Sequence, residues 1–276
     1  MTGAVSVAGH ATAQRDTRFE PGCELPFASI EVRRPVDGYC GPEGTAGSAA
    51  GRAQNRAKNN FCAPGPAFDL DLAGFRALQQ AADDAGIRRA PEGIPSPRWR
   101  RKLADIWRAP DGTALGEGSR VRFIGYIDRA FTARVGSGES VNCDLRTPEG
   151  NDIHLELGET RSPDDCDRLV TEISPHYRPL RWTPDRLVGI KLAGHPIRVT
   201  GQLFWDASHA PCSDGGDDGW RATSWEIHPV YAIEVCETRS LAACRAADLS
   251  QWVPLHRWSA ASPADDTDEA EVQPDP

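Results

Sequence analysis

Between residues 119 and 238, apolar residues recur at every second position, a pattern that most helical folds cannot accommodate. Successive side chains of a β-strand point to opposite sides, so this alternation predicts strands with one buried face. A further apolar run, Leu169–Ile173, is also read as extended. The alternating segments are Val121–Ile127, Val141–Leu145, Ile153–Leu157, Val199–Trp205 and Trp225–Val235.

One predicted helix interrupts these strands. The segment Thr183–Ala193 begins with a Thr-Pro pair, typical of an N-cap and a first helical position, and it stops before Gly194. Three strands, a helix and a two-stranded hairpin follow the order of an OB-type barrel. Gly125 lies where such a barrel needs a strongly curved first strand. A β-sandwich fragment is the alternative, but it would not need this helix. The fold class is therefore predicted as mainly β with helical additions, built on an OB-like five-stranded barrel over residues 118–238.

The regions on either side of the barrel differ from it in composition. Residues 21–117 are predicted to form a small, mixed but largely helical N-terminal subdomain. Residues 239–276 are read as a C-terminal extension with an acidic, disordered tail, and residues 1–20 as a disordered N-terminus. The elements expected in the N-terminal subdomain are a short strand over Ser29–Val32, helices over Gly47–Asn60 and Asp71–Ala85, and a third helix after Pro97 with Trp99, Leu103 and Trp107 at helical spacing.

Hydropathy excludes a membrane protein of the helical kind. No apolar run approaches 18 residues, so no membrane span is expected. The first twenty residues lack the apolar stretch of a signal peptide. The chain as encoded is therefore expected to be cytoplasmic, and exported only if the true start lies upstream.

Charge makes nucleic acid an unlikely partner. The chain has a net charge of −9, and residues 118–238 carry 13 basic against 19 acidic groups. Affinity for nucleic acids depends on Lys and Arg neutralising phosphates. The best basic footprint is Arg98–Arg108, which includes Trp99 and Trp107 and fits single-stranded nucleic acid. The helical spacing of its apolar residues instead favours a helix that packs both tryptophans on the barrel.

Eight cysteines give opposing indications about the compartment. The even count fits disulfides and an oxidising environment, whereas the missing signal peptide fits free thiols in the cytosol. No two cysteines have the C-x-x-C spacing of a zinc ribbon or a thioredoxin motif. Proximity in sequence gives three hypothetical pairs: Cys40 with Cys62, Cys143 with Cys166, and Cys212 with Cys236.

Six stretches resemble a group of uncharacterised bacterial proteins that contain an OB-like region. The resemblance covers residues 21–238, and it implies a fold and segment boundaries but no activity. The stretches are AKNNFCA (Ala57–Ala63), GESVNC (Gly138–Cys143), NDIHLEL (Asn151–Leu157), TEISPH (Thr171–His176), RVTGQLFWDASH (Arg198–His209) and WEIHPV (Trp225–Val230).

The main candidate for chemistry is a set of histidines and carboxylates on the predicted barrel. In the strand Ile153–Leu157 the odd positions are apolar, so Asp152 and His154 point to the opposite, outer face. Glu226 and His228 do the same in the last strand. Treating these two strands as the third and fifth of the barrel makes them parallel neighbours. The hairpin would then bring in Asp206 and His209, and the second strand would bring in Asn142 and Asp144.

Two functions follow from this set, and a third follows from the basic stretch Arg98–Arg108. The leading one is a binding or scaffold module that recognises a small polar ligand, a saccharide or a partner protein on the outer barrel face. The second is a metal-dependent hydrolase that uses a divalent metal such as zinc. The third is single-stranded nucleic-acid binding. Residues proposed to contact the ligand are Asn142, Asp144, Asp152, His154, Asp206 and Glu226; the proposed metal ligands are His154, His209 and His228, and the candidate catalytic bases are Glu172 and Glu226.

Each reading has a structural alternative. The same histidines and carboxylates would also form a network that only fastens the strand ends together. Lys58, Asn59 and Asn60 form a polar helix end, which either lies against the barrel face or simply caps and solvates the helix.

Overall fold

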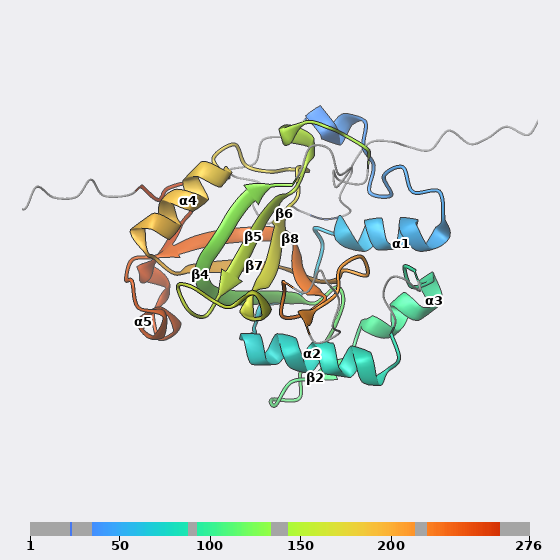
Figure 1. Cartoon of the computed structure of the whole chain (residues 1–276), viewed down its shortest axis with the longest axis horizontal. Coiled ribbons are helices and arrows are strands. Elements are labelled where there is room, and N and C mark those ends of the chain that lie inside the picture. The colour runs from blue at the N-terminus through green and yellow to red at the C-terminus, as the bar shows by residue number, and fades with distance from the viewer. Residues whose placement is uncertain (1–22, 24–34, 88–92, 134–142, 213–219, 260–276) are drawn as a thin grey trace, which may run out of the picture.

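The structure is a computed structural model that describes residues 23, 35–87, 93–133, 143–212 and 220–259. Its centre is a closed barrel of five strands, as predicted (Figure 1). The strands run in the order β4-β5-β6-β8-β7, and β4 also pairs with β7 to close the ring. The pair β6–β8 is parallel and the other pairs are antiparallel. The five strands are β4 (Arg120–Thr132), β5 (Ile153–Gly158), β6 (Leu169–Ile173), β7 (Ile197–Trp205) and β8 (Trp225–Cys236).

Strand β4 closes the barrel by changing partner at the predicted glycine. It pairs with β7 as far as Gly125, and with β5 from Tyr126 onward. A Cβ at Gly125 would lie 2.6 Å from the backbone oxygen of Gly158. Only glycine allows the two backbones to approach so closely at this point of the barrel.

The helix between the third and fourth strands is also confirmed. Helix α4 spans Pro184–Ala193, and the Thr183 side chain accepts a hydrogen bond from the backbone N–H of Arg186 at its start. It ends at Gly194, whose φ of 73° is the left-handed conformation that favours glycine. The buried side chains of Leu187 and Ile190 join the barrel core.

The prediction of a strand over residues 141–145 is wrong for residues 143–145, which the structure describes. Residues 143–147 form a loop, and residues 141–142 lie outside the described residues, as does the expected strand over residues 29–32. Asp144 has a φ of 57°, which breaks an extended strand. Cys143 and Leu145 owe their apolar spacing to a small cluster with Val36 and Cys40. The barrel's second strand is therefore β5, and its third is β6.

The helices of the N-terminal region lie on the outside of the barrel, with α1 beside it and α2 below it in Figure 1. Two predicted helices are present, whereas the third is a single turn followed by a 3-10 turn. Trp99 is 45% exposed, and Trp107 lies in a strand, so neither belongs to one long amphipathic helix. Leu103, between them, is fully buried. The elements are η1 (Pro35–Gly38), α1 (Ala49–Lys58), β1 (Phe68–Asp69), α2 (Leu72–Asp84), α3 (Pro97–Arg100), η2 (Arg101–Leu103), β2 (Trp107–Arg108) and β3 (Ala114–Leu115).

Short elements complete the fold. Strand β9 extends the sheet beyond β8, and β2 and β3 form a separate hairpin. None of the helices that the structure describes is long and apolar enough to span a membrane. The two ends predicted to be disordered lie outside the described residues. The short elements are η3 (Pro148–Gly150), η4 (Asp165–Asp167), α5 (Leu241–Arg245), η6 (Leu249–Gln251) and β9 (Trp252–Pro254).

The core confirms the predicted alternation in β5 and in the first half of β8. Four side chains expected in the core are at most 3% exposed: Ile153, Leu155, Ile227 and Ile233. Tyr231, expected on the same face as Ile227, packs instead with Phe61 and Tyr177 outside the barrel core. Register shifts between β7 and β8 around Gly201 change the face that Tyr231 occupies.

All eight cysteines are paired in four disulfides. The three pairs predicted from sequence proximity are wrong, because the fold joins three pairs of cysteines that are 39 to 103 residues apart and one pair that is only 8 residues apart. The observed pairs are Cys23–Cys62, Cys40–Cys143, Cys166–Cys212 and Cys236–Cys244.

Candidate functional site

Three neighbouring strands present ionisable side chains on the face opposite the barrel core. Asp152 lies at the start of β5, Glu172 on β6 and His228 on β8. The apolar neighbours of these residues, such as Ile153 and Ile227, point into the core, which directs the polar side chains outward. The last residue of α1, Lys58, reaches the same place from the N-terminal region.

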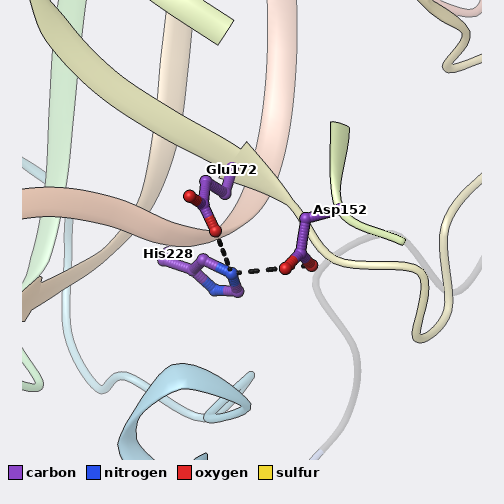
Figure 2. Close-up of side chains that lie close together, drawn as sticks. All are labelled: Asp152, Glu172 and His228. Carbon is purple, nitrogen blue, oxygen red and sulfur yellow. Dashed lines mark ion pairs between the residues drawn. The ribbon is translucent and has the colours of Figure 1, made fainter. Parts of the chain in front are cut away.

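The four groups form one ion cluster, and Figure 2 shows three of them, Asp152, Glu172 and His228. The His228 Nε2 lies 3.0 Å from Glu172 Oε2 and 3.7 Å from Asp152 Oδ1. The Lys58 Nζ lies 3.0 Å from Asp152 Oδ2 and 3.1 Å from Glu172 Oε2. Each carboxylate therefore lies between an imidazole and an ammonium group.

His154 contacts this cluster only at its edge. Its Nε2 lies 3.4 Å from Glu172 Oε1, and its ring stacks on Phe131 with the ring centroids 5.3 Å apart. The sequence prediction made the strands of His154 and His228 direct neighbours. In the structure β6 lies between them, because His154 pairs with Glu172 across β5 and β6.

A second cluster contains the other predicted residues. The His209 Nδ1 lies 2.5 Å from Asp206 Oδ2. Glu226 contacts the buried guanidinium of Arg221, which also lies 3.4 Å from Asp206 Oδ2. The predicted convergence of His154, His209, Glu226 and His228 at one point is thus replaced by two clusters.

Two further predicted residues lie elsewhere or cannot be placed. Asp144 is exposed in the loop before η3, rather than beside His154. Asn142 lies outside the described residues. His176, from one of the quoted stretches, is buried against Asp37 with its Nδ1 2.7 Å from Oδ1.

The cluster is buried, although the sequence placed it on an open outer face. His228 and Asp152 are fully buried, and Glu172 is 4% exposed. The end of α1 contributes to this cover, since the Lys58 side chain, which reaches both carboxylates, is only 17% exposed. The alternation within strands gave the correct face, but it carries no information about the helix that covers that face.

Mutual ion pairing sets the protonation of the cluster. Burial opposes the charged form of Lys58, but Asp152 and Glu172 outweigh it and hold the pKa of Lys58 well above its usual value. Burial likewise opposes ionisation of both carboxyls, yet Lys58 and the histidines lower the pKa of Asp152 and lower that of Glu172 strongly. The same carboxylates raise the pKa of His228 against the effect of burial.

Glu226 behaves differently from the other acids. Burial, with Glu172 and Asp206 nearby, raises the pKa of Glu226 well above its usual value despite the contact with Arg221. Burial opposes the charged form of Arg221, but Glu226 and Asp206 outweigh it and raise the pKa of the guanidinium. The second cluster therefore holds a carboxyl that gives up its proton reluctantly.

Sequence reasoning missed Arg221, and it named Lys58 only as part of a polar helix end that either lies against the barrel face or solvates the helix. Arg221 follows a Gly/Asp-rich loop, and nothing in its local sequence indicates burial. The signal for Lys58 was its position at the end of a predicted helix whose packing partner the strand alternation did not identify.

Comparisons of the whole chain with protein-family models, with curated proteins and with solved structures find no match, so the site is interpreted from its own chemistry.

Proposed function

We propose that this protein is a metal-binding module that holds one divalent ion, such as Zn²⁺, at Asp152, Glu172 and His228. One imidazole and two carboxylates are a donor set that Zn²⁺ accepts in proteins. The geometry of the three side chains supports the proposal most directly. One ligand atom from each lies within 4.8 Å of the other two. Ligand atoms bonded to one zinc lie roughly 3.3 Å apart, so small side-chain rotations bring them to the ion.

The charge of the cluster supports the same ion. Asp152 and Glu172 carry two negative charges, which Lys58 alone does not neutralise. A divalent ion matches both charges if the ammonium group leaves. Lys58 is at the edge of the cluster on a long flexible stem, so it is able to move toward solvent. In this proposal Lys58 is the resident cation that the metal displaces.

The second cluster is a weaker candidate for the same role. Asp206, His209 and Glu226 also bring three ligand atoms within 4.8 Å of one another. There the competing cation is Arg221, whose side chain is 1% exposed and contacts Glu226 directly. A guanidinium buried to this extent, and in contact with both acids of the cluster, is a stronger competitor for a metal ion than Lys58 is.

Burial favours binding over hydrolysis. A metal-dependent hydrolase needs the metal, a water and the substrate to meet, whereas the three proposed ligands are at most 4% exposed. Both candidate bases are already engaged, since Glu172 is a proposed ligand and Glu226 contacts Arg221. The metal is therefore proposed to complete and stabilise the barrel by joining β6 and β8 to the residue that precedes β5.

The disulfides bear on location. Bridges of this number form and persist in oxidising compartments and are rare in the cytosol. We infer that the protein works outside the cytoplasm, which replaces the cytoplasmic expectation drawn from its first residues.

Zinc titration of metal-free protein in a calorimeter tests the proposal. One ion per chain is expected, and Asp152→Asn, Glu172→Gln and His228→Asn should each weaken binding by about tenfold or more. Glu156→Gln is the matched control, because Glu156 is equally buried on β5 but pairs with Arg168. Asp206→Asn should bind zinc like the parent. Parent protein that binds no zinc, or loss of binding in Asp206→Asn alone, would contradict the assignment.

A further inference from the structure

A groove separate from the ion clusters runs between β1, α2 and the β2–β3 hairpin. It encloses about 630 Å³, within the range of roughly 300–1,000 Å³ typical of small-molecule sites. Phe68 and Trp107 form apolar walls, and the small residues Ala73, Gly74 and Ala77 of α2 leave the space open. None of the residues that line it belongs to either ion cluster. In Figure 1, α2 and β2, which provide part of its lining, lie below the barrel.

Trp107 is a rigid platform in this groove. It is held in the hairpin by pairing with Leu115, and it packs against the barrel core without being fully buried. One part of its indole is therefore fixed by the core while another part lines the groove. Trp99 provides a contrast, since it is outside the groove and Lys102 lies 3.7 Å over its ring.

Both arginines that line the groove are already paired with carboxylates. Arg122 forms a two-pronged pair with Asp69, with Nη2 2.7 Å from Oδ2 and Nε in contact with Oδ1. Arg245 also contacts a carboxylate, that of Glu159, but through one nitrogen only. Asp71 accepts a hydrogen bond from the backbone N–H of Gly74 at the start of α2. An anionic ligand would therefore find no unpaired cation among the described residues that line the groove.

The Asp69–Arg122 pair still presents hydrogen-bonding groups to the groove. The Asp69 side chain is 64% exposed, so its outward lone pairs are open to a ligand. The pair uses Nε and Nη2 of Arg122, which leaves Nη1 able to donate. Fixed donors and acceptors beside an aromatic face match a ligand that has hydroxyl groups around an apolar ring.

From this combination we propose that the groove binds a neutral saccharide, with one sugar ring stacked on Trp107 and its hydroxyls bonded to Asp69 and Arg122. The C–H face of a pyranose ring is apolar and packs on the electron-rich face of an indole. Neighbouring ring hydroxyls both donate and accept, so they bond to a carboxylate and a guanidinium together. This site is independent of the proposed metal site and extends the function beyond it.

Calorimetric titration with three neutral tetrasaccharides, of the maltose, cellobiose and N-acetylchitobiose series, tests the proposal. At least one should bind with a dissociation constant of about 10 μM to 1 mM. Trp107→Ala should weaken binding about tenfold or more, whereas Trp99→Ala should leave it unchanged. A tetragalacturonate of matching length should bind more weakly than the best neutral sugar, because the wall offers it no free positive charge.

A second pair of variants tests the groove without altering the core: one variant fills the groove and the other is its control. Ala73 is exposed on α2 and lines the groove, whereas Gln80 is exposed on the same helix and does not. Ala73→Phe should abolish sugar binding at an unchanged melting temperature, and Gln80→Phe should not. The proposal is overturned if no neutral sugar binds at a sugar concentration of about 10 mM, tenfold above the weakest expected dissociation constant. It is also overturned if Ala73→Phe binds sugar like the parent, or if the charged sugar binds more tightly than every neutral one. Asp152→Asn should still bind the sugar, which separates this test from that of the metal site.

Discussion

Lys58 is the residue on which the two interpretations of the buried cluster differ most clearly. As a structural ion pair, its ammonium is a permanent partner of Asp152 and Glu172. As part of a metal site, it is a competitor that must leave when the ion binds. Methionine keeps most of the length and apolar stem of lysine but carries no charge, so it separates these roles.

Lys58→Met is expected to lower stability without metal and to raise zinc affinity. Removing one partner of a buried ion pair costs about 3–5 kcal/mol, because the carboxylates lose their compensating charge. Zinc then binds without displacing a cation, so the dissociation constant should fall about tenfold or more. Urea unfolding with and without zinc measures both effects. A variant that is destabilised and not rescued by zinc would show that the cluster is only structural.

His209 gives the stability of the fold a specific pH dependence. Its hydrogen bond to Asp206 raises the pKa of the imidazole, against a smaller effect of burial. The folded protein therefore holds this proton more tightly than the unfolded chain, whose histidine pKa is about 6.5. The stabilisation is fully present below that pH and is lost as pH rises through the folded pKa.

As pH rises above about 6.5, the unfolding free energy of the parent should fall more than that of His209→Asn, because the parent loses this stabilisation as pH passes through the raised folded pKa. The difference between the two proteins isolates His209 from His228, whose pKa is also raised. At the acidic end the same bond lowers the pKa of Asp206, so its contribution is present above pH ~3.9 and is lost as pH falls further. Parallel pH profiles for the two proteins would rule out the Asp206–His209 contribution.

At the scale of elements, the change of partner in β4 depends on one glycine. An added Cβ at Gly125 would lie 2.7 Å from the Phe123 ring as well as close to the Gly158 oxygen. Gly125→Ala should therefore destabilise the protein by about 1–3 kcal/mol through overpacking. Gly189, within α4, has nothing within 4 Å of such a Cβ, so Gly189→Ala should be neutral or stabilising by up to ~1 kcal/mol. Equal unfolding free energies for the two variants would be evidence against a sterically required glycine at the crossing.

Local patterns predicted those elements whose residues all contact the same core. The alternation in β5 and the capped ends of α4 reflect a face or a turn that neighbouring residues define together. The pattern Val141–Leu145 has the same period but a different cause, because Cys143 is fixed by its disulfide to Cys40. Apolar spacing alone does not distinguish a core strand from a loop anchored to a small separate cluster.

The candidate site shows the same limit over longer distances. Alternation correctly placed Asp152 and His228 on one side of the sheet. The predicted strand order left out β6, however, and so made the strand of His154 a direct neighbour of the strand of His228. The cover provided by α1 and the partner Lys58 comes from a segment almost a hundred residues earlier in the sequence. Contacts of that range depend on the packing of the whole chain, and no local pattern encodes them.

At the scale of the whole molecule, the disulfides connect the barrel to the segments around it. Cys40–Cys143 ties η1, near the N-terminus, to the loop before β5 and spans 103 residues. Cys236–Cys244 joins the end of β8 to α5 and spans only 8 residues. In the chain-entropy picture, a bridge stabilises by restricting the unfolded chain, and the effect grows with the length of the loop it closes.

The long bridge is therefore expected to stabilise the fold more than the short one. The relation gives about 4.7 kcal/mol for a loop near 100 residues and roughly 2.5 kcal/mol for one of eight. Replacing both cysteines of each bridge by serine, and unfolding the two double variants in guanidinium chloride without reductant, compares them directly. Cys236 and Cys244 are both buried, whereas in the long bridge only Cys40 is, so the buried hydroxyls cost the short-bridge variant more and work against the expected order. Alkylation of the denatured, unreduced parent should label no thiol, since all eight are paired. A short-bridge variant that is the less stable of the two would mean that native packing around Cys236 and Trp252, rather than chain entropy, sets the value of these bridges.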